Sequence, residues 1–145
     1  MKPKWINRTG KIFILISATS FFYVSVMALF SPQTVMDLVG VKLPNNDAYS
    51  SIRGVYGGVG LSLVVALIYL SIWDVRKGLS FLCLLWGFYA LSRIITIIND
   101  GALGDFGNQW LMIESVFFCI SSTLLYLQHK STVLTKNVSR QHPVL

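Results

Sequence analysis

Four long apolar stretches constrain what this chain can fold into more than any other feature of its sequence. Each supplies roughly the 20 residues that a helix needs to cross a hydrocarbon core of about 30 Å. The second helix is expected to begin ahead of its apolar run, near Asp47. The predicted membrane spans are residues 12–30, 47–73, 79–98 and 110–127.

The composition excludes a soluble fold. Hydrophobic residues make up 54% of the 145 residues and charged residues only 12%, about half the charged fraction of roughly 25% in soluble domains. A chain this short has a large surface to cover with polar groups. Disorder is also excluded, because it requires low hydrophobicity and high charge. We therefore predict an all-α integral membrane four-helix bundle that forms a single domain over residues 1–130.

The connections between the spans are short, which makes neighbouring helices antiparallel. Residues 74–78 and 101–107 form two of them. In the first connection, Ser31 suits a helix N-cap, Pro32 the first helical position and Gly40 the residue beyond the end. We therefore predict a short surface helix between the first two spans.

The segments that flank the spans have their own signals. Asn46 or Asp47 is expected to cap the second span. The polar residues 131–145 lack apolar periodicity and are predicted to form a disordered tail. The first apolar run is longer than the 7–15 residues typical of a signal peptide, so we expect it to remain as a span.

The distribution of basic residues predicts the orientation in the membrane. Nine of them lie on one side of the predicted spans, and Lys42 is the only one on the other. The nine are Lys2, Lys4, Arg8, Lys11, Arg76, Lys77, Lys130, Lys136 and Arg140. By the positive-inside rule both termini are cytoplasmic. The net charge of +6 is thus a topology signal, and no nucleic-acid partner is expected.

Three ionisable residues lie within the predicted spans: Arg53, Arg93 and Glu114. A charge at the centre of a membrane helix costs about 2.5–3.5 kcal/mol on insertion scales, so such residues usually face the interior and pair. At 1.5 Å per residue they lie roughly 9, 10 and 6 Å from the same membrane face. They could form a ligand site. Alternatively, Arg53 extends to the head groups, and Arg93 with Glu114 forms a purely structural pair.

The third span carries a stripe of polar and amphipathic residues. Spacings of three and four place Trp86, Tyr89, Arg93, Thr96 and Asp100 on one helix face. Such a stripe could line a pocket for an amphiphile, or it could serve packing alone. The predicted ligand-binding residues are Arg53, Tyr56, Tyr89, Arg93, Thr96, Asp100 and Glu114.

Small residues recur at every fourth position of the second span. The predicted helix-packing residues are Ser50, Gly54, Gly58, Ser62 and Ala66. Such a ridge allows membrane helices to approach closely. It could pack within the bundle, or dock a second copy or the helix of another membrane protein. Gly57 and Gly60 clear a second face, which could admit a ligand or a helix.

Motifs of catalysis and of cofactor binding are missing from the sequence. Two cysteines and two histidines do not supply a metal site, and we expect no cofactor. The predicted function is therefore non-enzymatic: binding of an anionic or amphiphilic small molecule or a lipid. An accessory subunit that docks another helix is the alternative, and an enzyme that uses Glu114 in proton transfer is a third. Transport is disfavoured, because no span is visibly broken and no repeat is visible.

Several local motifs together resemble a known family. They are Phe30-Ser31-Pro32, Leu38-Val39-Gly40, Arg53-Gly54-Val55-Tyr56-Gly57-Gly58, Arg93 followed by Asn99-Asp100-Gly101, and Glu114. Over residues 12–127 the chain resembles the small bacterial four-helix membrane proteins grouped as domain of unknown function 4345, and more distantly the DoxX-type proteins. The resemblance implies a multi-pass protein of the bacterial inner membrane. It implies no reaction.

Overall fold

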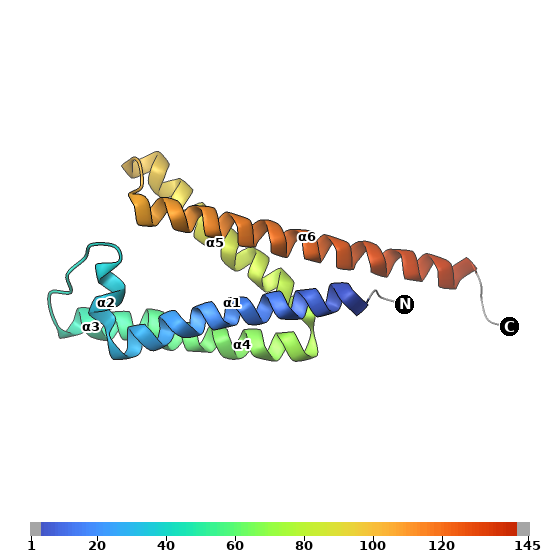
Figure 1. Cartoon of the computed structure of the whole chain (residues 1–145), viewed down its shortest axis with the longest axis horizontal. Coiled ribbons are helices and arrows are strands. Elements are labelled where there is room, and N and C mark those ends of the chain that lie inside the picture. Colours follow the sequence, from blue (N-terminus) through green and yellow to red (C-terminus); the bar gives the residue numbers. More distant parts are fainter. Residues whose placement is uncertain (1–3, 142–145) are drawn as a thin grey trace. The chain divides into compact units, whose positions relative to one another are not determined.

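The computed structural model describes residues 4–141, and the side chains of residues 5–131. Its elements are α1 (Lys4–Phe30), α2 (Pro32–Asp37), α3 (Asn46–Ile52), the π-helix η1 (Arg53–Val59), α4 (Gly60–Trp73), α5 (Val75–Asp100) and α6 (Asp105–Gln141) (Figure 1). No strand occurs within residues 4–141. The predicted all-α class is confirmed.

Four helices are long and apolar enough to cross a membrane, as predicted. They are Trp5–Phe30, Asn46–Trp73, Val75–Asp100 and Asp105–Ser131. The second consists of α3, η1 and α4 without interruption. Each helix extends beyond its predicted apolar run, because backbone hydrogen bonding continues into the polar flanks. The chain is therefore a multi-pass membrane protein.

The chain folds as two compact units. The first comprises residues 1–13 and 74–145, and the second comprises residues 14–73. The long helix α1 contributes to both.

In the first unit, α5 packs against α6. Gly87 lets the ring of Phe118 come close, since a Cβ at position 87 would lie 3.1 Å from a ring carbon. The Cys83 thiol and the Ser122 hydroxyl are 3.2 Å apart and share a hydrogen bond. Small side chains and a polar contact therefore join these two spans.

The connection ahead of α5 is shorter than predicted, because Asp74 alone separates two helices. The Asp74 carboxylate accepts a hydrogen bond from the backbone N–H of Lys77 at 3.1 Å and so caps α5. It also pairs with the Lys77 ammonium at 3.3 Å. The backbone hydrogen bond from Lys77 holds the pKa of Asp74 below its ordinary value.

The connection ahead of α6 is also shorter than the predicted 101–107. It ends at Gly104, whose carbonyl accepts from the backbone N–H of Asn108 at 3.0 Å. The Asn108 side chain in turn donates to the carbonyl of Leu103 at 3.0 Å. Gly101, at φ +103°, supplies the left-handed residue that ends α5.

The end of α6 differs from the sequence prediction. The chain is helical over residues 131–141, where we predicted a disordered tail. No glycine or proline occurs between Gly107 and Pro143, so nothing in the sequence interrupts the backbone hydrogen bonds. Residues 142–145 of the predicted tail lie outside the described residues.

In the second unit, the predicted short helix α2 connects the first two spans. Pro32 occupies its first turn after Ser31, as expected, although the Ser31 side chain makes no capping hydrogen bond. Gly40, at φ +69°, ends the segment. Its N–H donates to the Asp37 carbonyl at 3.1 Å, and the next N–H donates to the Met36 carbonyl at 3.0 Å. This pair of bonds is a Schellman motif.

The loop after α2 is fixed by side chains of polar residues. The Gln33 amide donates to the carbonyl of Val41 at 2.9 Å and accepts from the N–H of Leu43 at 3.0 Å. Asn45, rather than the predicted Asn46 or Asp47, caps α3, because its side chain accepts from the N–H of Ala48 at 2.9 Å. These bonds set where the second span begins.

Candidate functional site

A bidentate ion pair in the first unit joins two of the three predicted intramembrane charges. Arg93 on α5 donates from Nε to Glu114 Oε2 at 2.7 Å and from Nη2 to Oε1 at 2.9 Å. The Glu114 side chain is only 2% exposed, whereas that of Arg93 is 23% exposed. Both carboxylate oxygens are thus occupied by one guanidinium, in the bidentate geometry that arginine favours.

Aromatic side chains pack against one another in this unit, about one to two helical turns from Arg93 and Glu114 along α5 and α6. The Phe117 ring meets Trp86 edge-on at a centroid distance of 4.9 Å and lies 5.3 Å from the ring of Phe13. Tyr89 lies 6.2 Å from Trp86 along α5. The inward part of the predicted stripe therefore serves helix packing in this unit, which was one of the two readings of the sequence.

Thr96 and Asp100 do not join the ion pair. The Thr96 hydroxyl donates to the Ser92 carbonyl at 3.0 Å, a common use of threonine in a membrane helix. Asp100 is exposed at the end of α5, seven residues or roughly 10 Å beyond Arg93. Among the described residues, no hydrogen bond or ion pair links either of them to Arg93 or Glu114.

Arg53 belongs to the second unit and has a different kind of partner. Its Nε donates to the backbone carbonyl of Leu29 at 3.0 Å, and its guanidinium carbon lies 6.0 Å from the centre of the Tyr49 ring. Leu29 is in the last turn of α1, where carbonyls have no partner within the helix and carry partial negative charge. Arg53 therefore caps the C-terminal end of α1, a role that charge pairing alone could not reveal.

The rest of the Arg53 side chain is open. Arg53 is exposed, and the described part of the chain gives its Nη groups no hydrogen-bond acceptor. Tyr56, three residues further on, is 40% exposed. The second unit therefore presents a cation with unused donors, together with a phenol on the same span.

Arg53 is also the first residue of the π-helix η1 (Arg53–Val59), which sequence reasoning missed. A π-helix widens the backbone turn, and such segments occur frequently at functional sites. The signal in the sequence was the cluster of Gly54, Gly57 and Gly58. Glycine leaves the local backbone free to adopt the wider turn.

The helix α1 lies against the face of Gly57 and Gly60, one of the two occupants, a ligand or a helix, that the sequence left open. A Cβ at Gly57 would lie 2.6 Å from Leu29, and one at Gly60 would overlap the Ser25 hydroxyl. This face packs against α1 and is not an opening beside Arg53. A Cβ at Gly54 or Gly58 would meet nothing within 4 Å.

The predicted ridge is therefore largely open. Ser50, Gly54, Gly58 and Ser62 are exposed, and Ala66 is partly buried. The Ser62 hydroxyl donates to the Gly58 carbonyl at 3.0 Å and needs no other partner. Within the second unit, no atom lies within 4 Å of a Cβ built at Gly54 or Gly58, and the two predicted uses of the ridge, packing within the bundle and docking of another helix, both stay predictions.

Comparisons with known proteins identify the family and no activity. No curated protein and no solved structure matches this chain. The model of the family described as Domain of unknown function (DUF4345) matches residues 10–125. This range includes the Arg93–Glu114 pair, Arg53 and the glycine-rich second span. As its local motifs predicted, the chain belongs to the DUF4345 family.

Proposed function

We propose that this protein is a non-enzymatic membrane protein that binds the anionic head group of a lipid or another amphiphile through Arg53. One observation carries the proposal: the Arg53 guanidinium is held in place by its Nε while its Nη groups remain open. A guanidinium offers five N–H donors in a planar fork that matches phosphate and carboxylate oxygens. With one donor bonded to Leu29, the others are available to an anion.

The position of Arg53 supports an amphiphile rather than a soluble anion. Arg53 lies seven residues beyond Asn46, where the second span begins, or roughly 10 Å along the helix. A charge at such a depth is costly without a partner of opposite sign. A lipid head group can supply that charge while its chains stay among the exposed apolar side chains of the spans. Tyr56, close by on the same span, supplies a further hydroxyl.

Arg93 has a supporting role in this proposal. Its Nε and Nη2 are bonded to Glu114, and the pair is neutral as a whole. It fixes α5 to α6. Glu114 is not favoured as a proton-transfer group, since both of its oxygens already accept hydrogen bonds from Arg93.

Lipid retention in native mass spectrometry tests the proposal. The purified protein is incubated with phosphatidylglycerol, which is anionic, or with phosphatidylcholine, which is zwitterionic. We expect selective retention of phosphatidylglycerol and a loss of one bound molecule in Arg53→Gln. Lys42→Gln is the matched control, because it removes one exposed base from the same unit.

A second variant covers the case in which Arg53→Gln does not fold. Arg53→Lys keeps the positive charge, and its ammonium can bond to the Leu29 carbonyl in place of Nε. The ammonium of lysine lacks the planar Nη donors that would bind a head group, so retention of phosphatidylglycerol should still fall. Unchanged retention in a folded Arg53 variant would refute the proposal.

Docking of another membrane helix is the second candidate function, and one observation favours it. Within the second unit, a Cβ at Gly54 or Gly58 would meet nothing within 4 Å, so this unit leaves the ridge free for another helix. Gly58→Leu should then abolish a crosslinked complex with a second copy or another membrane protein while leaving the monomer folded. A complex that survives this substitution would exclude the ridge as its interface.

The proposal includes a location and an orientation. The family resemblance and the distribution of basic residues support one four-span domain over residues 1–130 in a bacterial inner membrane, with both termini cytoplasmic. Lys42 and Arg53 then lie on the periplasmic side, where a head group of the outer leaflet is accessible.

A further inference from the structure

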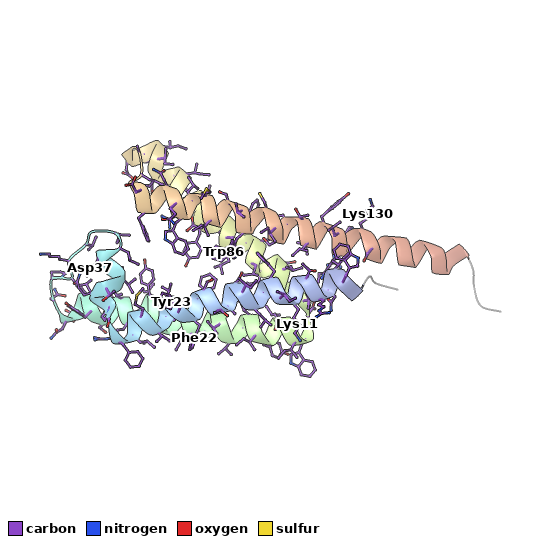
Figure 2. All side chains as sticks on the ribbon, viewed as in Figure 1. Lys11, Phe22, Tyr23, Asp37, Trp86 and Lys130 are labelled. Atoms are coloured by element: carbon purple, nitrogen blue, oxygen red, sulfur yellow. The ribbon has the colours of Figure 1, made fainter. Side chains whose placement is uncertain are left out.

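A second group of cations gathers at one end of the first unit, independently of Arg53. It consists of Arg8 and Lys11 on α1, Arg76 and Lys77 on α5, and Lys130 on α6, and we call it the basic end. All five side chains are exposed. Lys11 and Lys130 are labelled in Figure 2.

Contacts between the three helices bring these residues to the same end. A Cβ at Gly10 of α1 would lie 2.9 Å from Val75 of α5 and 3.6 Å from the side-chain nitrogen of Gln128 of α6. The Arg76 guanidinium lies 3.3 Å from Nδ1 of His129 on α6 and shares a hydrogen bond with it. Each of these contacts lies within two residues of a cation of the basic end.

The charges of the basic end are barely neutralised within the chain. Asp74 pairs with Lys77 at 3.3 Å. Among the described residues, no carboxylate forms an ion pair with Arg8, Lys11, Arg76 or Lys130. The side-chain partner that the structure gives the Arg76 guanidinium is His129, which is not an anion. Four cations therefore gather at one end of the unit, and in the described part of the chain none of them forms an ion pair with a carboxylate.

Exposed amphipathic rings indicate that this end lies at the level of the lipid head groups. Trp5, three residues before Arg8, is 60% exposed, and Tyr126, four residues before Lys130, is 63% exposed. Exposed Trp and Tyr side chains near the ends of membrane helices settle at the interface between lipid and water. The cations between them lie where phosphate groups of the adjoining leaflet can reach them.

We propose that the basic end binds the phosphate of an anionic phospholipid in the leaflet next to it. Basic clusters at the ends of several membrane helices attract such lipids by charge, and Arg76 adds the planar donors that suit a phosphate diester. The site differs from the one proposed at Arg53, which belongs to the other unit.

The test measures retention of phosphatidylglycerol by native mass spectrometry in the double variant Arg76→Gln/Lys77→Gln. We expect weaker binding by about fivefold for each charge removed, as for basic residues at an anionic membrane surface. Arg53→Gln and Lys42→Gln serve as controls and should leave this site unchanged. If only Arg53→Gln loses a bound phosphatidylglycerol, the site at Arg53 is supported and the basic end is not. If only the double variant loses one, the basic end is supported and the site at Arg53 is not.

Helicity and thermal unfolding verify that the double variant is folded. Lys77→Gln keeps the backbone N–H that Asp74 accepts, so the cap of α5 survives. If the double variant does not fold, Lys11→Gln/Lys130→Gln removes the same charge from the other two helices. Unchanged phosphatidylglycerol binding in a folded variant would overturn the proposal, as would equal binding of phosphatidylcholine. Displacement of the lipid by inorganic phosphate at equal concentration would assign the site to free phosphate instead.

Discussion

The buried carboxylate of Glu114 depends on a single residue, Arg93, to compensate its charge. It is 2% exposed, and Arg93 donates to both of its oxygens. In a buried ion pair, the gain in attraction roughly offsets the cost of removing both charges from water. Removing one member alone leaves the other charge without compensation. The pair therefore matters most when it is broken from one side.

A double-mutant cycle tests this dependence. Arg93→Met or Glu114→Leu alone should each reduce the free energy of unfolding by about 3–5 kcal/mol. The double variant should be more stable than either single variant. Thermal and denaturant unfolding in detergent measure the effect, and Asp100→Asn is the matched control, since Asp100 is exposed on the same helix. Additive losses in the double variant would contradict a direct pair.

Gly60 and Gly58 provide a second comparison between single residues. A methyl group at position 60 would overlap Ser25, whereas one at position 58 would meet nothing within 4 Å. Gly60→Ala should therefore destabilise the protein by about 1–3 kcal/mol through overpacking. Gly58→Ala should change the stability much less, because a methyl group at position 58 meets no neighbour within 4 Å. Equal melting temperatures for the two variants would count against the observed packing of α1.

The charged residues of the candidate site, Arg53, Arg93 and Glu114, could be predicted from the sequence, but the partner of Arg53 could not. The depth of Arg93 and Glu114 predicted that they could pair. Arg53 instead bonds to a backbone carbonyl of Leu29, and such acceptors carry no signature in a sequence. The choice between the two glycine faces likewise depended on which side chains of α1 lie opposite.

At the scale of elements, single residues decide where the spans begin. Asp74 caps α5 and Asn45 caps α3, each through a side-chain bond to a backbone N–H three residues later. The boundaries predicted from the sequence lie a few residues away, because apolar length reveals the centre of a span and not its polar first turn. The π-helix η1 was missed for a related reason: the glycine cluster permits such a turn but does not require it.

The cap at Asp74 makes one end of α5 sensitive to acid. Because the pKa of Asp74 is lowered in the folded protein, its stabilising contribution is complete above the ordinary carboxyl pKa of about 3.9. The contribution is lost as the pH falls through the lowered value. Hydrogen exchange at the Lys77 amide should report this loss.

Asp74→Ala should cost about 1 kcal/mol at neutral pH and should abolish this acid dependence. Asp105→Ala is a suitable control, since Asp105 is an exposed acid in the first turn of another helix. An unchanged acid profile in Asp74→Ala would show that other groups control the stability of this turn.

For the whole molecule, the distribution of charge predicts the topology. In a background with Cys83 and Cys119 replaced by alanine, Lys42→Cys should react with an impermeant maleimide added to intact cells. Lys77→Cys should react only after the membrane is permeabilised, because the proposed orientation keeps the side rich in basic residues in the cytoplasm. The opposite pattern of labelling would invert the proposed orientation.

The number of spans, their order and the short α2 helix could be predicted because apolar length, proline and glycine act locally. The contacts that give Arg53 and Arg93 different roles could not, because they join residues far apart in the sequence. Arg53 bonds to Leu29, 24 positions earlier, and Arg93 bonds to Glu114, 21 positions later. Because of these contacts, the guanidinium of Arg93 is paired with a carboxylate, whereas the Nη groups of Arg53 keep unused donors.

The open arginine is central to the proposed function, and solid-state NMR tests it most directly. Protein with ¹⁵N-labelled arginine is placed in phosphatidylglycerol bilayers, and dephasing of the guanidinium signals by lipid ³¹P reports contact with a phosphate. We predict a dephased Nη signal that is present in the wild type and absent in Arg53→Lys. If both proteins give the same set of dephased signals, Arg53 does not hold a lipid phosphate and the proposed function is contradicted.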